Sequence, residues 1–388
     1  MTTVLVEPDP GGHRFQAVAN VARAAAGFGD DVVVLTSTGA RQNPAFVEFL
    51  GPLDLTAKEV FDAIYPPTAE MAARVADECR AGQVSTVVVM DADQSLKRWW
   101  YAAPRAFRGV RRPRVVFMLT RYPAKLRISD RTGWRLRIPK AALAVLAMAT
   151  GSLHRAAGFA GRDDMSSGWL VKRVRDPDLC GAHSRDRAAL RAELGLPADR
   201  HVAGIFGVIS ARKHAPLIWE AMAIHGIEGD LLLAGALDPD VEEWVESLPE
   251  EPRGRVLVRN AFLSNDELDK LVAAVDVVPI ALSNNGPSGI MGKALAAEVP
   301  VVTAGSEVRA RELVATDGGE LAELDADSIG AAMVRVLTRD PTEPRRNTIP
   351  PATAEEFARN LLGVDDAGRV TSRRGRARGS ASGAASIR

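Results

Sequence analysis

Cysteine is scarce in this 388-residue sequence, which contains only Cys79 and Cys180. The two lie far apart and have no cysteine or histidine neighbours at metal-ligand spacing, which excludes a disulfide framework and a cysteine-based zinc site. Long hydrophobic runs are also missing: the longest, 141–149, is about half the length that a membrane-spanning helix needs. The first residues become polar at once, unlike a signal peptide. We therefore expect a cytoplasmic protein, at most peripheral at the inner face of a membrane.

An excess of either charge is absent as well, because 49 Lys and Arg residues balance 49 Asp and Glu residues. Overall charge therefore gives no indication of a nucleic-acid-binding protein. Hydrophobic residues make up 46% of the chain and charged residues 25%, as in an ordinary globular protein. At about 150 residues per domain, the length predicts two large domains.

Short apolar runs rich in β-branched residues alternate with longer segments rich in alanine and arginine. Continuous apolar strands separated by helix-length segments are typical of a parallel sheet that is buried on both faces. The pattern predicts an α/β fold with two doubly wound, Rossmann-like domains facing across a cleft. The expected strands are 4–6, 32–35, 84–90, 115–119, 143–148, 202–208, 231–233, 256–258, 275–280 and 299–303.

The polar, turn-rich segment before residue 185 is the expected linker between the domains. We place an acceptor domain at 1–184 and a donor domain at 185–345. A C-terminal helix is expected at 346–364. The remaining segment, 365–388, is rich in arginine and has almost no apolar residues to bury, so we expect a disordered basic tail.

Two glycines, Gly11 and Gly12, come directly after the first expected strand and directly before an expected helix. Glycine lets the backbone approach a ligand closely, and a helix amino end favours an anion. A tight strand-to-helix turn without a ligand is an equally good interpretation. The G-x-G-x-x-G spacing is absent, so nicotinamide and flavin cofactors are not indicated. Among the histidines only His13 lies in a candidate site, with an acceptor-side role or a helix-capping role.

A second glycine turn begins at Gly207, follows the first strand of the second domain and leads to Arg212 and Lys213. Arginine offers a planar fork and lysine a point charge, and proteins use both to neutralise phosphate groups. We interpret the pair as a diphosphate site. The alternative is a solvated pair of charges at a loop.

A third loop, rich in glycine and serine, opens the helix that precedes the last expected strand. Its residues Ser288, Gly289 and Ile290 would present free backbone N–H groups to phosphate or sugar oxygens. The alternative is that Ser288 only caps the helix.

Taken in order, these three segments resemble the retaining two-domain glycosyltransferases of the GT-B fold, particularly family 4 (glycosyl transferases group 1). The resemblance implies an enzyme that moves a sugar from a nucleotide-diphosphate donor to an acceptor with retention, without a metal or other cofactor. It implies that Arg212 and Lys213 grip the donor diphosphate and, with His13, form the catalytic set. The other implied donor-binding residues are Gly11, Gly12, Gly207, Asn285, Ser288, Gly289, Ile290 and Lys293.

The motif that carries two glutamates in this family is changed here, with Asn285 at the first position and Lys293 at the second. The Asn285 amide can still hydrogen-bond a sugar hydroxyl. Lys293 cannot accept a hydrogen bond from ribose, and would instead pair with a phosphate or a carboxylate-bearing sugar. Asp93 or Arg121 would make the acceptor contacts that the family assigns to a histidine. A catalytically inactive binding or partner subunit with the GT-B fold is therefore the alternative function.

Asp91 and Asp93 follow an expected strand as an Asp-x-Asp pair. The other large glycosyltransferase class, GT-A, presents such a pair to a divalent metal. Short matches of this kind are common, so we favour a plain strand end and expect no metal.

Fourteen Lys or Arg residues and a single acid, Asp130, lie between Lys97 and Lys140, interleaved with aromatic residues. Long cations with aromatics suit the surface of an anionic membrane, and they also suit an anionic or lipid-linked acceptor. Nucleic acid would use the same charge but is not expected as a partner. The alternative is a solvated, arginine-rich face.

Overall fold

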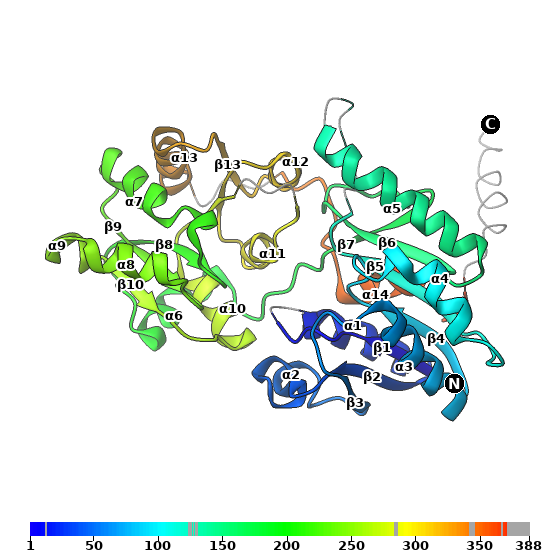
Figure 1. Ribbon diagram of the computed structural model, residues 1–388. Helices are drawn as coiled ribbons and strands as arrows, with labels where there is room; N and C mark the ends of the chain where they lie inside the picture. The colour runs from blue at the N-terminus through cyan, green and yellow to red at the C-terminus, as the bar shows by residue number, and fades with distance from the viewer. Residues whose placement is uncertain are drawn as a thin grey trace, which may run out of the picture.

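The computed structural model describes residues 1–11, 14–122, 126, 128, 131–282, 286–340, 346–365 and 368–370. Two parallel sheets, one in each half of the chain, organise these residues (Figure 1). The expected tail beyond residue 370 lies outside the described residues. None of the described helices has the length and hydropathy of a membrane-spanning segment.

The first sheet has seven parallel strands in the order β3-β2-β1-β4-β5-β6-β7. Buried apolar side chains cover both of its faces, which accounts for the continuous apolar runs of its central strands. Helices α3, α4 and α5 pack on one face, and α1, α2 and the C-terminal α14 pack on the other. The strands are β1 (Thr2–Val6), β2 (Asp31–Ser37), β3 (Thr56–Phe61), β4 (Val84–Val89), β5 (Arg114–Leu119), β6 (Arg155–Ala160) and β7 (Val171–Arg175). The helices are α1 (Arg14–Gly27), η1 (Ala40–Gln42), α2 (Pro44–Phe49), α3 (Thr68–Ala81), α4 (Leu96–Ala106), α5 (Arg131–Ala149) and α14 (Ala354–Leu362).

The second sheet consists of two parallel groups, β10-β9-β8 and β11-β12-β13, which a bridge between Ala203 and Val277 joins. Helices α7, α8 and α13 pack on one face and α6, α10, α11 and α12 on the other. The strands are β8 (His201–Phe206), β9 (Gly229–Ala234), β10 (Val256–Arg259), β11 (Val278–Ala281), β12 (Val301–Ala304) and β13 (Gly319–Ala322). The helices are η2 (Ser184–Asp186), α6 (Arg187–Leu194), η3 (Ala211–Lys213), α7 (Ala215–Ile224), α8 (Pro239–Ser247), α9 (Glu250–Arg253), α10 (Asn265–Ala274), α11 (Gly289–Ala296), α12 (Glu307–Thr316) and α13 (Ala326–Thr338).

Both sheets therefore have the doubly wound strand order, and the predicted fold class is confirmed. The direction of winding reverses between β1 and β4 in the first sheet and between β8 and β11 in the second. In such sheets ligands bind beyond the carboxyl ends of the strands at these two switch points. The two glycine turns singled out in the sequence, which contain Gly11 and Gly207, come after β1 and β8, the strands at the two switch points.

One expected strand, 143–148, is wrong, because these residues form the second half of α5. Alanine dominates this part of the chain, and alanine has the highest helix propensity. Strands β3, β6, β7 and β13 were not expected. β3 and β7 carry charged side chains, so they lack a continuous apolar run.

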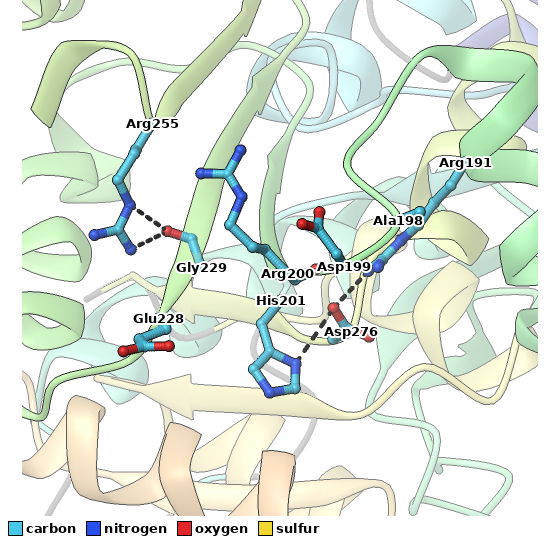
Figure 2. A pocket seen from close by; sticks show the side chains of 9 residues that line it. All are labelled: Arg191, Ala198, Asp199, Arg200, His201, Glu228, Gly229, Arg255 and Asp276. Carbon is cyan, nitrogen blue, oxygen red and sulfur yellow. Dashed lines mark hydrogen bonds and ion pairs between the residues drawn. The ribbon is translucent and has the colours of Figure 1, made fainter. Parts of the chain in front are cut away.

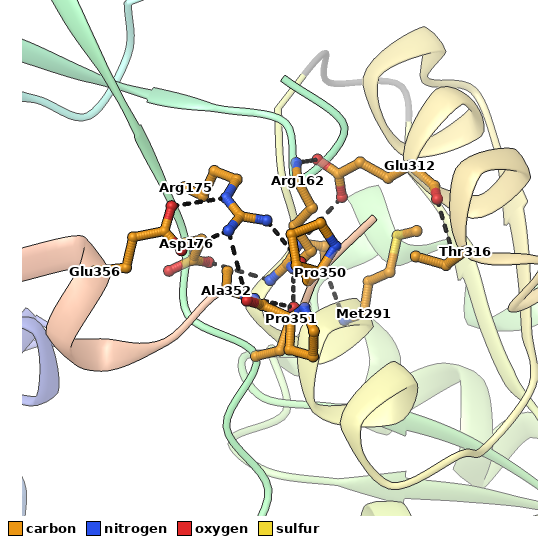
Figure 3. A network of polar contacts seen from close by, with 12 residues as sticks. Arg162, Arg175, Asp176, Met291, Glu312, Thr316, Pro350, Pro351, Ala352 and Glu356 are labelled. Carbon is orange, nitrogen blue, oxygen red and sulfur yellow. Dashed lines mark hydrogen bonds and ion pairs between the residues drawn. The ribbon is translucent and has the colours of Figure 1, made fainter. Parts of the chain in front are cut away.

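A buried guanidinium joins the two domains (Figure 3). Arg162 follows β6 and has no solvent exposure, and its Nη1 lies 3.1 Å from Oε2 of Glu312, a fully buried residue of α12. Its backbone N–H donates to the other Glu312 oxygen at 3.0 Å. Asp178, after β7, accepts from Arg162 Nε. Burial opposes the charge of Arg162, but these carboxylates raise its pKa overall.

The chain returns to the first domain through the same region. Asp178 donates its N–H to the Ala352 carbonyl at 2.8 Å and accepts from the Ala352 N–H at 3.0 Å. Arg175, at the end of β7, binds Glu356 of α14 and donates to the Pro350 carbonyl at 2.7 Å. These contacts hold α14 on the first domain although it follows the second domain in sequence.

We predict that Arg162→Ala destabilises the protein by about 3–5 kcal/mol, because it leaves Glu312 buried without its cation. Urea unfolding followed by tryptophan fluorescence measures the loss. The matched control is Arg311→Ala, which removes the partly exposed partner of Asp163 at 3.3 Å. That change should cost less than about 1 kcal/mol, and equal losses for the two variants would contradict the prediction.

Candidate functional site

Helix α1, which follows β1, contacts the start of α10, which follows β10. Gln16, in the first turn of α1, donates to Asn265 at the start of α10 at 3.5 Å. The Asn265 N–H donates to Glu48 of the first domain at 2.6 Å. In Figure 1, α10 and α11 accordingly lie on the side of the second domain next to α1. The carboxyl ends of β1 and β10 therefore approach one another.

On the second domain, a glycine turn brings the basic pair to the switch point. Gly207 directly follows β8 and has a φ of 83°. Gly235, after β9, lies so close that a Cβ atom there would be 2.2 Å from the Gly207 carbonyl oxygen. Helix η3, which contains Arg212 and Lys213, lies against β11. The loop after β8 and the strand on the other side of the switch point are thus in contact.

In the described part of the chain, no carboxylate neutralises the charges of this pair. The Lys213 ammonium donates to the Phe206 carbonyl, and burial together with the Arg212 charge lowers its pKa to about 8. Arg212 is exposed, and within the described ranges neither side chain has a carboxylate partner. An anion bound here would relieve the repulsion between the two cations.

Helix α11 follows β11, the strand beside β8 at the switch point of the second sheet. Ser288 caps the helix by accepting from the Met291 N–H at 3.3 Å, so the capping interpretation holds for its hydroxyl. Gly289 and Ile290 are the first helical residues, and their N–H groups have no acceptor within the helix. Asn285, Gly12 and His13 lie outside the described residues.

Lys293 is used inside the second domain. Its side chain is buried and forms an ion pair with Asp269 of α10, and it donates to the Asn265 side chain at 2.7 Å. Asp269 also accepts from the Gly181 N–H in the linker at 2.7 Å. The structure therefore brings Lys293 to α10 and the linker rather than to the basic pair.

On the first domain, four groups that follow β1 and β4 meet at the switch point. The Arg14 guanidinium, at the start of α1, lies 2.7 Å from Asp91, 3.2 Å from Asp9 and 3.7 Å from Glu7. Gly11 joins this cluster because its N–H donates to Asp9 at 2.8 Å. Glu7 is 2% exposed, and burial raises its pKa to about 8 against the opposing effect of Arg14.

Asp93 forms the second part of this polar edge. It accepts from the Thr120 hydroxyl at 3.0 Å and from the Arg121 N–H at 2.9 Å, and Lys140 of α5 pairs with it. The Arg121 side chain is exposed. The predicted acceptor candidates Asp93 and Arg121 therefore lie together.

Sequence reasoning missed Glu7, Arg14 and Lys140. For Glu7 and Arg14 a signal was present, since both flank the glycine pair directly after the first strand. Lys140 had none, because only the packing of α5 brings it to Asp93.

The described side chains include no group of three or more His, Cys, Asp or Glu residues arranged to hold a metal ion. Asp91 and Asp93 share the Thr120 hydroxyl, and each also has a cation partner. Both carboxylates are thus already engaged by protein groups.

A hollow of about 660 Å³ lies at the opposite edge of the second sheet (Figure 2). His201 and Gly229, the first residues of β8 and β9, are part of its wall. The hollow is therefore at the amino end of β8, whereas Arg212 and Lys213 follow the carboxyl end of this strand. Its lining residues are Arg191, Ala198, Asp199, Arg200, His201, Glu228, Gly229, Arg255 and Asp276.

Solved structures with the same arrangement of domains belong to the GT-B fold, and the chain has this fold. It is similar to Anabaena HepE in complex with UDP-glucose (TM-score 0.59, 16% identity, 93% of this chain and 95% of that chain). It is also similar to sucrose-phosphate synthase from Thermosynechococcus elongatus (0.60, 16%, 93% and 94%). A third similar structure is WaaG, a glycosyltransferase involved in lipopolysaccharide biosynthesis (0.55, 15%, 94% and 96%). No family model and no curated protein sequence matches the chain.

We predict that Glu7→Gln changes how stability depends on pH. Between the unfolded pKa of about 4.3 and the folded value of about 8, the folded protein holds a proton that the unfolded chain has lost. The wild-type stability should therefore fall as pH rises through this window, by about 1.4 kcal/mol per pH unit for this group, and level off above it.

Glu7→Gln removes this slope, so the variant should gain stability over the wild type between pH 5 and pH 8. Denaturant unfolding at several pH values measures the difference. The control, Glu246→Gln, removes an exposed carboxylate from α8. Parallel pH profiles for the wild type and Glu7→Gln would contradict the assignment.

Proposed function

We propose that the protein is a glycosyltransferase that transfers a sugar from a nucleotide-diphosphate donor to an acceptor. One observation carries the proposal: Arg212 and Lys213, two cations without a carboxylate partner in the described chain, follow a glycine turn at the switch point of a GT-B second domain. That HepE is in complex with UDP-glucose supports a nucleotide sugar as the donor class.

The basic pair would act on the leaving group. As the bond between the sugar C1 and the phosphate oxygen breaks, negative charge develops on the diphosphate, and preorganised cations stabilise this charge. The Lys213 pKa of about 8 leaves its ammonium protonated at neutral pH, and a bound diphosphate would favour the charged form further. The N–H groups of Gly289 and Ile290 would hold the transferred sugar.

We propose retention of configuration and independence from metal ions. The acceptor oxygen would bond to C1 on the face that the phosphate leaves, and its proton would pass to the departing phosphate oxygen. The two cations would supply the neutralisation that a metal ion supplies in other transferases. The engagement of Asp91 and Asp93 by Arg14 and Lys140 supports this assignment.

The acceptor would bind at the switch point of the first domain. Its hydroxyls would donate to the carboxylates that line this edge, and Asp93 and the exposed Arg121 would contact it. Glu7 and Asp91 surround Arg14, which fixes Asp9 and through it the Gly11 backbone. Arg14 is thus proposed as a positioning residue for the glycine loop.

One observation favours the second candidate function, an inactive binding subunit with this fold. Lys293, at the second motif position, forms a buried ion pair with Asp269. Its ammonium group is therefore not available to bind the donor. Nucleotide binding without sugar transfer would support this function.

We predict that the double substitution Arg212→Ala, Lys213→Ala weakens UDP or GDP binding by at least 100-fold. Two charge-assisted hydrogen bonds contribute roughly 3–6 kcal/mol together. Calorimetric titration with UDP, GDP and their sugars measures the affinity. The control is Arg185→Ala, Arg253→Ala, which removes two exposed arginines from the same domain. Unchanged nucleotide affinity in the Arg212→Ala, Lys213→Ala variant would contradict the assignment of the donor site to this pair.

We predict that EDTA leaves the reaction of the bound nucleotide sugar unaffected and that the product keeps the donor's anomeric configuration. Slow hydrolysis of the donor, followed by NMR, reports the first-formed anomer without knowledge of the acceptor. Loss of turnover in EDTA with recovery in Mg²⁺ or Mn²⁺ would contradict metal independence. An inverted first product would contradict retention.

A further inference from the structure

Three carboxylates surround the buried guanidinium of Arg162, and they differ in how their oxygens are satisfied. Both oxygens of Glu312 accept hydrogen bonds from Arg162 itself. Those of Asp178 accept from Arg162 Nε and from the Ala352 N–H. The third carboxylate, that of Asp176, lies 3.6 Å from Arg162 Nη2 and accepts no hydrogen bond from the described residues (Figure 3). Asp176 is therefore the member of this cluster whose oxygens remain available to a ligand.

The Asp176 carboxylate lies beside the first turn of α11. Asp176 directly follows β7, and 15% of its side chain is exposed. A Cβ atom at Gly289, the first residue of α11, would lie 3.9 Å from Asp176 Oδ2. Apart from chain neighbours and the backbone of α11, no other described atom lies within 4 Å of that position. The absence of a side chain at Gly289 thus leaves open space between the carboxylate and the helix.

Arg162 fixes Asp176 at this place. Its Nη2 atom packs against the same turn of α11, where a Cβ atom at Gly292 would collide with it. The guanidinium is shared by three carboxylates, so it cannot neutralise all of their charge. The outermost of them, Asp176, therefore presents a negative charge to the amino end of α11.

The groups that meet here complement a hydroxyl group. A carboxylate only accepts hydrogen bonds and a backbone N–H only donates them, whereas a hydroxyl does both. The N–H groups of Gly289 and Ile290 have no acceptor within the helix. A hydroxyl beside Gly289 would donate to Asp176 and accept from this turn. A phosphate oxygen would be repelled by Asp176, because both are anionic.

We propose that Asp176 binds hydroxyl groups of the transferred sugar and thereby selects a donor whose sugar carries them. This inference rests on the proposed function, whose donor site it deepens. The two motif positions that carry glutamates in similar transferases hold Asn285 and Lys293 here, and Lys293 pairs with Asp269. Asp176 supplies the donor site with an acid from the linker instead. It is thus a specificity-determining residue that contacts the sugar and not the diphosphate.

Calorimetric titration of the full chain with UDP, UDP-glucose, GDP and GDP-mannose tests the proposal. Asp176→Ala should weaken binding of the nucleotide sugar by at least about tenfold, because a hydrogen bond to a charged group is lost, and should change binding of the bare nucleotide by less than about twofold. The matched control is Asp163→Ala, which removes another carboxylate at the domain boundary, the partner of Arg311 at 3.3 Å. It should change neither affinity by more than about twofold.

Monodeoxy analogues of the nucleotide sugar that binds identify the hydroxyl. One analogue should bind the wild type about as weakly as the parent sugar binds Asp176→Ala, and it should lose no further affinity in that variant. Such non-additivity indicates direct contact between the two groups that were removed. Additive losses for every analogue would contradict a contact between Asp176 and the sugar.

Gly289→Ala tests the same space while the Arg162 cluster stays intact. Its methyl group would lie 3.9 Å from Asp176 Oδ2, where the hydroxyl is proposed to bind. It should therefore weaken the nucleotide sugar more than the nucleotide. Thermal unfolding verifies that each variant is folded, and Gly289→Ala decides the outcome if Asp176→Ala is not.

The results separate this inference from the proposed function. If the wild type binds a nucleotide sugar, and Asp176→Ala leaves it unchanged or weakens nucleotide and nucleotide sugar equally, the role of Asp176 is overturned while the proposed function stands. If the wild type binds none of the four probes, the proposed function fails and this inference fails with it.

Discussion

The relation between the two sheets depends on one buried cation. Arg162, which follows β6, forms an ion pair with Glu312 of the second domain. Asp178 in the linker forms a second ion pair with the same guanidinium. Burying charges is costly unless they are paired and hydrogen-bonded. Here the carboxylates come from both domains, and any rearrangement that separated Arg162 from Glu312 would leave a charge buried alone. The ion pair therefore favours one orientation, in which the two carboxyl edges face one another.

That orientation brings edges of opposite electrostatic character together. At neutral pH the first edge carries three carboxylates, from Asp9, Asp91 and Asp93, and the protonated Glu7, beside two cations, Arg14 and Lys140. The second edge carries Arg212 and Lys213 without a carboxylate partner in the described residues. A sugar diphosphate has an anionic end and a hydroxyl-rich end. The cationic edge suits its diphosphate, and the acidic edge suits hydroxyl donors that approach the sugar.

Local sequence predicted much of this arrangement. The continuous apolar runs of β1, β2, β4, β5 and β8 identified the parallel sheets, because burial on both faces leaves a clear pattern. The glycine turns and the Arg212–Lys213 pair were visible because they are contiguous. The pairing of Lys293 with Asp269 and that of Arg162 with Glu312 were not visible. Each pair depends on which helices pack together. The sequence around a single charged residue does not indicate which residue will pair with it.

The misassigned strand 143–148 has a physical explanation that bears on the outer surface of α5. A continuous apolar run predicts a strand on the assumption that both sides of the segment are buried, as they are in a sheet between two layers of helices. In α5 the inner side meets the sheet through Ala144 and Ala147, whereas Val145 and Leu146 on the outer side are exposed to solvent to 49% and 39%. Packing within the fold therefore requires only half of the apolar residues in this run.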